Sequence, residues 1–299
     1  TYLAARKKDF YKIENAADGK HFVTARGWDD LSEMIKLYEE NGLAVDEQLI
    51  CQYLQDARIS KDFAIYYDLF NKYRSDYQVE KILDGTVSES IVLRAERASM
   101  DERLSLLGLI FDSVTAQLRM VCERENILDL VTGQLKTLKE KLKDVSGAAA
   151  LLSEMIEAER EKLERGKQSS SISPQTQRET RFMLEYLEEF RAAVMQSGTA
   201  QKDEFSIVRE SFAQKVAELK GLAADGGRAL ENVFSFCEKA FADGDEILIF
   251  VTELTANYYS ARFIGRYGCD RYYMHNKQLQ FDQRQQEIIK RMDEIQWTV

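Results

Sequence analysis

The chain has 299 residues, 44% of them hydrophobic and 31% charged, and its formal net charge at pH 7 is −10. It contains one proline and 15 glycines, which is too few turn-forming residues for an all-β sandwich or barrel. The acidic balance argues against a dedicated nucleic-acid-binding protein, and the hydrophobic fraction excludes wholesale disorder. We therefore expect an all-α fold, arranged as two domains or as one extended helical body.

The cysteines and the longest apolar runs indicate where the protein resides. Cys51, Cys122, Cys237 and Cys269 lie far apart, so neither a zinc cluster nor a disulfide framework is expected. No apolar run reaches the ~18 residues that a spanning helix needs, and no signal peptide is visible. We expect a cytoplasmic protein without membrane insertion. Because the chain opens on a helix-like stretch without a methionine, we also expect it to be a piece of a longer protein.

The first 85 residues predict a small helical bundle. The segment 1–14 has a helical pattern, and 14–22 is expected to be a loop. Three further helices are then expected to begin at residues that are good N-caps, namely Thr24, Asp46 and Ser60. We place the end of this first domain at residue 85.

Residues 86–299 predict a larger, elongated helical bundle or coiled-coil extension. A heptad seam runs through Met100, Leu104, Leu107, Phe111, Val114, Leu118 and Val121, and a similar pattern continues over 128–145. We expect the seam to pack inside its own chain rather than against a partner, because later helices supply matching stripes. Whether this region projects as an arm is left open by the sequence.

The remaining segments continue in helical style. A helix is expected over 147–165, followed by an exposed connection over 166–177, in which Ser173 caps the next helix and Pro174 takes its first position. Apolar stripes then predict three separate helices, 244–268 is interpreted as one buried helix, and a last helix is expected over 272–295. The aromatic residues of this tail, Tyr258, Tyr259, Phe263, Tyr267, Tyr272, Tyr273 and Phe281, are interpreted as core, with an exposed docking patch as the alternative.

Few residues suggest chemistry within this chain. The phosphate-loop pattern GxxxxGK[ST] and the dinucleotide pattern GxGxxG are both absent. Only His21 and His275 occur, neither with a second histidine at ligand spacing, and Glu-x-x-His is absent. We therefore predict no catalytic residue, no metal ligand and no complete nucleotide site in this chain.

One segment resembles a known family. The stretch HFVTARGWDDLSEMIKLYEENG (21–42) resembles the start of the third helix of the lid subdomain in MoxR-type AAA+ ATPases, which opens with a small residue, Pro, Arg, any residue and Trp. The matching residues are Thr24, Arg26 and Trp28, and Ala25 stands where proline is usual. The helices that follow, to residue 85, resemble the end of such a lid, and 250–279 resembles the helical extension of some bacterial members.

The resemblance implies a role for Arg26 as the second sensor. An arginine beside a helix N-terminus stands at a natural anion site, and its guanidinium can contact a γ-phosphate bidentately; Thr24 would cap the helix beside it. The full-length protein would then hydrolyse ATP with magnesium as a ring, and this chain alone would be inactive. Its partners would be the upstream AAA+ core, neighbouring ring subunits and an unknown client protein.

Other interpretations stay open. Arg26 is alternatively a surface arginine next to a cap. The chain is alternatively a helical scaffold or protein-interaction module without a nucleotide role. A third possibility is a complete small enzyme, which would need a deep pocket with convergent polar groups.

Overall fold

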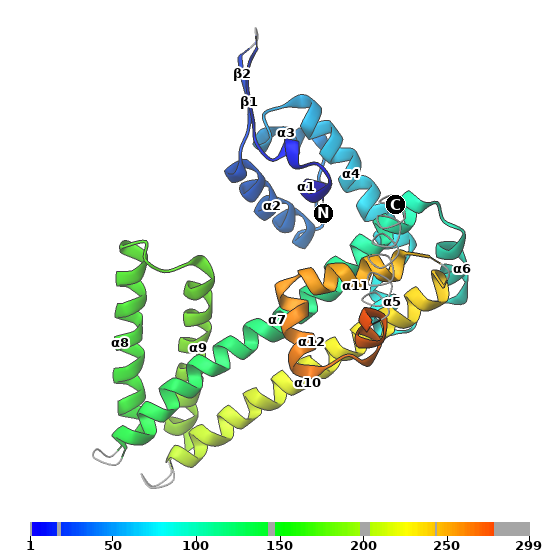
Figure 1. The fold of residues 1–299 in the computed structure, drawn as a ribbon. Helices are drawn as coiled ribbons and strands as arrows, with labels where there is room; N and C mark the ends of the chain where they lie inside the picture. The colour runs from blue at the N-terminus through cyan, green and yellow to red at the C-terminus, as the bar shows by residue number, and fades with distance from the viewer. Residues whose placement is uncertain (1, 17–18, 143–146, 198–203, 243, 278–299) are drawn as a thin grey trace, which may run out of the picture. The chain divides into compact units, whose positions relative to one another are not determined.

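The fold is all-α. A computed structural model describes residues 2–16, 19–142, 147–197, 204–242 and 244–277, and this part of the chain contains twelve α-helices and one two-stranded sheet (Figure 1). The chain divides into two compact units. The first comprises 1–82 and 86–110, and the second comprises 83–85 and 111–299. The division therefore falls at 110–111, inside a helix, whereas the sequence places a domain boundary at 85.

The first unit combines a hairpin with short and medium helices. Its elements are α1 (Tyr2–Ala5), a 3₁₀ turn (Lys7–Asp9), β1 (Lys12–Ala16), β2 (Gly19–Val23), α2 (Ala25–Glu40), α3 (Glu47–Tyr53), α4 (Ala57–Asp76), α5 (Val79–Asp84, ending in the second unit), α6 (Glu89–Arg97) and the first turns of α7 (Met100–Lys141). Its main apolar cluster is formed by Tyr2, Val23, Trp28, Leu31, Ile50, Leu54 and Ile59.

The N-terminal segment differs from the prediction. The expected helix over 1–14 covers only α1 and the 3₁₀ turn, and the expected loop over 14–22 is largely an antiparallel hairpin in which Ile13 pairs with Phe22. Because side chains alternate along a strand, Val23 enters the core while Ile13 and Phe22 stay exposed. The prediction of a helix followed by a loop did not anticipate that these residues form a hairpin with one face buried against the helices.

Side-chain caps fix the starts of α3 and α4. Asp46 caps α3 by accepting from the backbone N–H of Leu49 at 2.9 Å. Asp56 caps α4 by accepting from the N–H of Ile59 at 3.0 Å, so the prediction that Ser60 begins this helix was wrong. Ser60 lies inside α4, where it is buried and its hydroxyl donates to a carbonyl before the helix.

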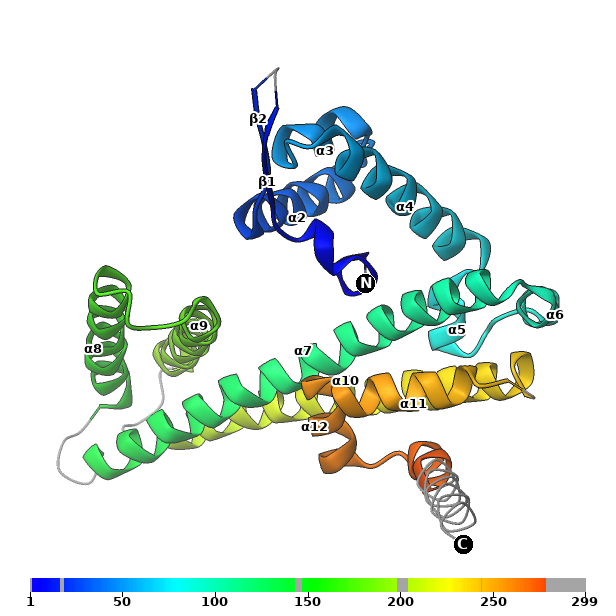
Figure 2. The same cartoon turned by 45° about the horizontal axis from the view of Figure 1, so that its top comes forward.

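The second unit is built from long helices. Besides most of α7 it contains α8 (Ala148–Gln168), α9 (Pro174–Ser197), α10 (Glu204–Ala240), α11 (Glu246–Ala256) and α12 (Tyr258–Tyr267). α7 has 42 residues and α10 has 37, and the two run side by side in both views (Figures 1 and 2). The stripes predicted as separate helices over 205–219 and 230–241 are therefore one continuous helix.

Two apolar clusters hold these helices together. α8 and α9 form a helical hairpin whose core includes Leu152, Leu187 and Phe190, packed against Leu138 of α7 and Val208 of α10. A second cluster joins α7, α10 and α12 through residues such as Leu118, Ala223 and Phe263. The later seam positions Val114, Leu118 and Val121 are buried within the chain, whereas Met100 and Leu104 at its start are exposed.

The ends of the later helices agree with the sequence in part. The hydroxyl of Ser173 accepts from the N–H of Thr176 at 3.1 Å, and α9 begins at Pro174, as predicted. The connection before it is shorter than 166–177, because α8 continues to Gln168. Most of the last predicted helix, 272–295, lies outside the described residues.

The predicted single helix over 244–268 is wrong. It divides into α11 and α12 at Asn257, whose side chain accepts from the N–H groups of Tyr259 and Ser260 and so caps α12. An asparagine in a capping conformation ends one helix and starts the next at the same residue. Gly268 closes α12 with a φ of 81°, as predicted from the sequence.

Among the described residues, one helix, α7, has the length and apolar composition to cross a membrane. Buried core helices commonly have the same two properties, and 39% of the most apolar 18-residue stretch of α7 is buried in the structure.

Candidate functional site

The N-terminus of α2 holds both residues that the sequence singles out. The hydroxyl of Thr24 accepts a hydrogen bond from the backbone N–H of Gly27 at 3.2 Å, and the backbone of Thr24 has an extended conformation. Arg26 lies in the first turn, where the free N–H groups and the positive end of the helix dipole favour an anion. Thr24 thus caps the helix and Arg26 stands beside the cap.

The guanidinium of Arg26 faces solvent. Its side chain is 89% exposed, and its Nε lies 3.5 Å from an Oδ of Asp30, one turn further along α2. A pair of this kind between two exposed side chains contributes only about 0.3–0.5 kcal/mol. Arg26 is therefore not buried in an internal ion pair, and a ligand from outside the unit can displace Asp30.

Trp28 attaches α2 to the start of the chain. Its indole is buried, and its Nε1 donates to the backbone carbonyl of Asp9 at 3.1 Å. The buried carboxylate of Asp9 in turn accepts from the hydroxyl of Tyr2 at 3.0 Å and from Nη2 of Arg58 at 3.3 Å. Asp9 thus links α1, α2 and α4, and these bonds hold α2, the helix that carries Arg26, in place.

Gly27 allows α2 to approach the end of α3. A Cβ at this position would lie 2.7 Å from the carbonyl oxygen of Tyr53, which is closer than such atoms come in practice. In the sequence motif, residue 27 is an unspecified position. The structure gives it a steric role that depends on a residue 26 positions away.

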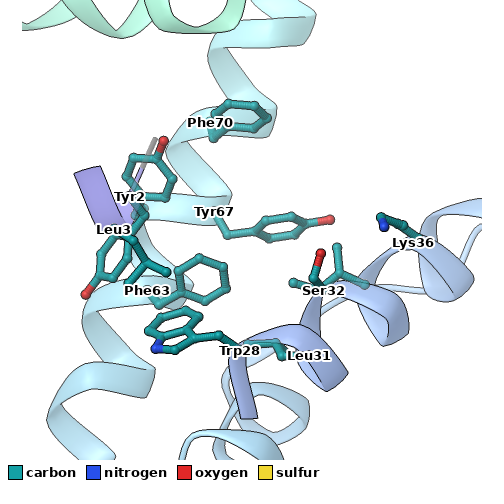
Figure 3. Close-up of a pocket in the computed structure, with 11 residues that line it drawn as sticks. Tyr2, Leu3, Trp28, Leu31, Ser32, Lys36, Phe63, Tyr67 and Phe70 are labelled. Carbon is teal, nitrogen blue, oxygen red and sulfur yellow. The ribbon is translucent and has the colours of Figure 1, made fainter. Parts of the chain in front are cut away.

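An aromatic pocket lies between α2 and α4 (Figure 3). It has a volume of about 320 Å³ and is lined by Tyr2 and Leu3 of α1, by Trp28, Leu31, Ser32, Ile35 and Lys36 of α2, and by Phe63, Tyr66, Tyr67 and Phe70 of α4. We call it the α2–α4 pocket. Ser32 and Lys36 are exposed polar residues on the α2 side, whereas the α4 side presents rings.

A second pocket continues along α4. It has a volume of about 570 Å³ and is lined by Tyr66, Leu69, Phe70 and Tyr73 of α4, by Ser99 just before α7, and by Asp101, Glu102, Leu104, Ser105, Gly108 and Leu109 of α7. We call it the α4–α7 pocket. Tyr66 and Phe70 line both pockets, so the two adjoin on one face of α4.

The sequence indicates only part of this surface. The helical stripe of α4 contains Phe63, Tyr67, Phe70 and Tyr73, but such a stripe is typical of core. It does not reveal that Tyr66 stays partly exposed or that Tyr2 completes the lining. Both facts depend on which helices pack beside α4.

The other side chains that could take part in catalysis or metal binding are buried or bonded to neighbouring residues. Burial, the largest cause, raises the pKa of Cys122 and Cys237, and it raises that of Cys269 to about 12, so these thiols are poor nucleophiles at neutral pH. His275 contacts Glu238 at 3.0 Å and stacks on Phe234. In the described part of the chain, no cluster of three or more His, Cys, Asp or Glu side chains is suited to a metal ion.

The aromatic tail is divided between core and surface. Phe263 and Tyr272 are buried, whereas Tyr258, Tyr267 and Tyr273 are exposed, and Phe281 lies outside the described residues. The interpretation of this tail as core therefore holds for only some of its members.

Comparison with known proteins gives no relative to guide the assignment. No protein-family model, no curated protein and no solved structure matches the chain.

Proposed function

We propose that this chain is the C-terminal part of a MoxR-like AAA+ ATPase, and that Arg26 is the second sensor for an ATP bound mostly by an upstream module. The observation that supports this proposal is the position of Arg26. It lies in the first turn of a helix capped by Thr24, its side chain is 89% exposed, and its contact with Asp30 is weak. A guanidinium in this place is free to bind a phosphate supplied from outside the chain.

The proposed mechanism couples phosphate contact to movement of the first unit. While ATP is present, Arg26 bridges α2 to the γ-phosphate, and hydrolysis removes that contact. Because Trp28 fixes α2 to Asp9 and to the rest of the cluster, the release of one side chain is transmitted to the whole unit. The energy of hydrolysis is thereby converted into rotation of the lid.

The proposal extends to the whole protein. Full-length protein hydrolyses ATP with magnesium in the cytoplasm as a ring, with the upstream core and neighbouring subunits completing the site. This chain lacks a phosphate-loop sequence, so it does not hydrolyse ATP alone. The extension beyond the lid contacts a client protein and couples hydrolysis to its remodelling.

The test is ATP hydrolysis by full-length protein carrying Arg26→Ala. We expect kcat to fall by at least about tenfold, because a donor to the transferred phosphate is lost from the transition state. Arg26→Lys keeps the charge but loses bidentate geometry, so we expect an intermediate value. The coding sequence upstream of residue 1 should also contain GxxxxGK[ST].

A matched control separates this effect from general loss of surface charge. Arg228 of α10 is also exposed and also pairs with a carboxylate on its own helix, Asp225. Arg228→Ala should leave kcat within about twofold of wild type, since an exposed pair contributes little. Unchanged turnover in Arg26→Ala, or a reading frame that starts at residue 1, would remove the sensor role.

The second candidate is a helical scaffold or interaction module without a nucleotide role. The observation that favours it is the second unit, in which the larger part of α7, from residue 111 onward, and the 37-residue α10 carry the α8–α9 hairpin. Under this candidate, neither the Arg26 variants nor magnesium and ATP would change any property of the protein. The same ATPase assay therefore distinguishes the two.

A further inference from the structure

We propose that one face of α4 is a docking groove for an amphipathic helix of a partner protein, with apolar residues on one face of that helix and basic residues on the other. The groove consists of the α2–α4 pocket and the α4–α7 pocket, which we call together the α4 groove. Tyr66 and Phe70 line both pockets and make them continuous. Arg26 lines neither pocket.

The length of the α4 groove suits a short helix. Its floor runs along α4 from Phe63 to Tyr73, which corresponds to about 15 Å at 1.5 Å per residue. The rings of Phe63 and Tyr66 lie 6.4 Å apart, and those of Tyr66 and Phe70 lie 6.1 Å apart. A partner helix of about ten residues would cover this row and place apolar side chains at i, i+3 or i+4, and i+7 over it.

The apolar surface of the groove is accessible. Leu69 of α4 is 44% exposed and Leu104 of α7 is 39% exposed, and both line the α4–α7 pocket. The rings of Tyr66, Tyr67 and Phe70 are also partly exposed. These exposed apolar side chains lie together in the groove and not singly, so one apolar helix face could cover them at once.

The charges around the groove select a basic partner. Lys36 on the α2 side already pairs with Glu33 at 2.6 Å. The other charged residues that line the groove or bond to its lining are mostly acidic. Asp101 and Glu102 belong to the lining. The others bond to it: Glu39 accepts from Tyr67, the buried Asp9 accepts from Tyr2, and Arg94 lies 3.9 Å from Glu102. The lining itself carries two carboxylates, Asp101 and Glu102, and one cation, Lys36, which already pairs with Glu33, so a helix flanked by Lys or Arg complements the rim.

A peptide helix fits these pockets better than a small molecule does. Small-molecule sites orient their ligand with a few buried polar groups. Here the buried polar atoms of the lining, the hydroxyl of Tyr2 and Nε1 of Trp28, are already bonded to Asp9. The lining residues with non-aromatic polar side chains are exposed or half-buried, namely Ser32, Lys36, Ser99, Asp101, Glu102 and Ser105. The groove has aromatic rings in its lining and charged side chains among its exposed residues. It therefore matches an amphipathic helix that has apolar side chains on one face and charged side chains on the other.

Trp28 provides a reporter for the experiment, because it lines the α2–α4 pocket. The chain has two tryptophans, so Trp297→Phe leaves Trp28 as the single emitter. The probe is a 14-residue peptide of leucine and lysine with leucines on one helical face. We expect saturable binding, seen as a change in Trp28 emission, and at least about tenfold weaker binding of the same peptide with glutamate in place of lysine.

Two variants test the location of binding. Leu69→Gln with Leu104→Gln places amides in the groove without emptying the core, and we expect it to weaken binding at least about tenfold. Leu93→Gln on α6 is the matched control, since Leu93 is 42% exposed but lines neither pocket; its affinity should stay within about twofold of wild type. Circular dichroism verifies that each variant is folded.

Three results would overturn the proposal. One is the absence of peptide binding at millimolar concentration, and another is equal affinity for the lysine and glutamate peptides. The third comes from sedimentation of the chain without peptide. If wild type is a dimer and the Leu69→Gln, Leu104→Gln variant is a monomer, the groove is occupied by a second copy of this chain instead of a basic helix.

Discussion

The indole Nε1 of Trp28 donates a hydrogen bond of 3.1 Å to the backbone carbonyl of Asp9, and both residues are buried. The bond joins α2 to the 3₁₀ turn before the hairpin. The carboxylate of Asp9, in the same turn, also accepts hydrogen bonds from the hydroxyl of Tyr2 and from Arg58. Trp28 therefore contributes both apolar area and a specific donor. The two contributions can be separated by substitution.

Trp28→Phe should destabilise the first unit by about 1–3 kcal/mol, since the carbonyl of Asp9 loses its partner in a buried place. Trp28→Ala should cost about 3–5 kcal/mol, because it also removes the ring from the cluster. Urea unfolding followed by far-UV circular dichroism measures both. Tyr11→Phe is the control, because Tyr11 is exposed and should tolerate the change within about 0.5 kcal/mol. Equal stability of Trp28→Phe and wild type would show that the hydrogen bond is not needed.

Gly27→Ala should destabilise the protein by about 1–3 kcal/mol, although alanine is the better helix former. The added Cβ would lie 2.7 Å from the carbonyl oxygen of Tyr53, so α2 and α3 would have to separate. The control is Gly221→Ala in α10, where nothing lies within 4 Å of the added atom. There the free energy of unfolding should rise by about 0.5–1 kcal/mol. Stabilisation by both substitutions would contradict the close approach.

Local signals in the sequence predict much of the helical architecture. Thr24, Asp46 and Ser173 stand at helix starts and Gly268 at a helix end because capping is decided by a few neighbouring residues. The heptad seam likewise predicts helix, although it does not show that α7 is continuous over 42 residues.

The break at Asn257 is also a local cap, but the apolar spacing continues across it over 244–268, so the spacing alone predicts one helix. Other features depend on tertiary packing and could not be found from local signals. The hairpin is stabilised by burial of Val23 and by the bond from Lys12 to Asp56, which is 44 residues away. The α4 groove is accessible only because of what lies beside α4. Arg26 is exposed in the structure, and its role stays a prediction.

Asp56 should make stability depend on pH in the acid range. Burial raises the pKa of its carboxyl, but the hydrogen bonds from Lys12 at 2.7 Å and from the N–H of Ile59 outweigh burial, so the pKa is lowered from 3.8. A lowered pKa in the folded state contributes stability above the unfolded value, and this contribution is lost as pH falls through the folded value. Asp56 therefore stabilises the protein at pH 7, and this contribution is lost in acid once the pH lies below the lowered folded pKa.

The measurement compares Asp56→Asn with wild type across that range. Asparagine retains the cap of α4 but carries no charge, so it cannot form the ion pair with Lys12. We therefore expect the free energy of unfolding to fall by about 1 kcal/mol at pH 7, and this difference to disappear below the folded pKa. Asp56→Ala should cost about 1 kcal/mol more at every pH, because the cap is also removed. A difference between Asp56→Asn and wild type that does not change with pH would show that the charge of Asp56 is not coupled to folding.

Glu125 is a buried carboxylate of α7 that contacts α12. Its side chain is 2% exposed. The carboxylate pairs with Nη2 of Arg262 at 3.1 Å and with Nε of Arg266 at 2.8 Å, and it accepts a hydrogen bond from the hydroxyl of Tyr267 at 2.5 Å. Glu125→Gln keeps the shape but leaves two guanidinium groups near an uncharged amide. Since breaking a buried ion pair from one side is costly, we expect a loss of about 3 kcal/mol.

Glu123→Gln is the matched control for Glu125→Gln, because Glu123 lies on the same helix and pairs with Arg119 at 2.7 Å nearer the surface. A pair of that kind contributes about 0.5 kcal/mol or less. Denaturant unfolding followed by far-UV circular dichroism should therefore separate the two substitutions by more than about 2 kcal/mol. If both variants lose the same small amount, the carboxylate of Glu125 is solvated in the folded protein, and α12 is held on α7 by the Leu118–Phe263 cluster without the ion pairs. A large loss in Glu125→Gln alone assigns the attachment of α12 to its two arginines.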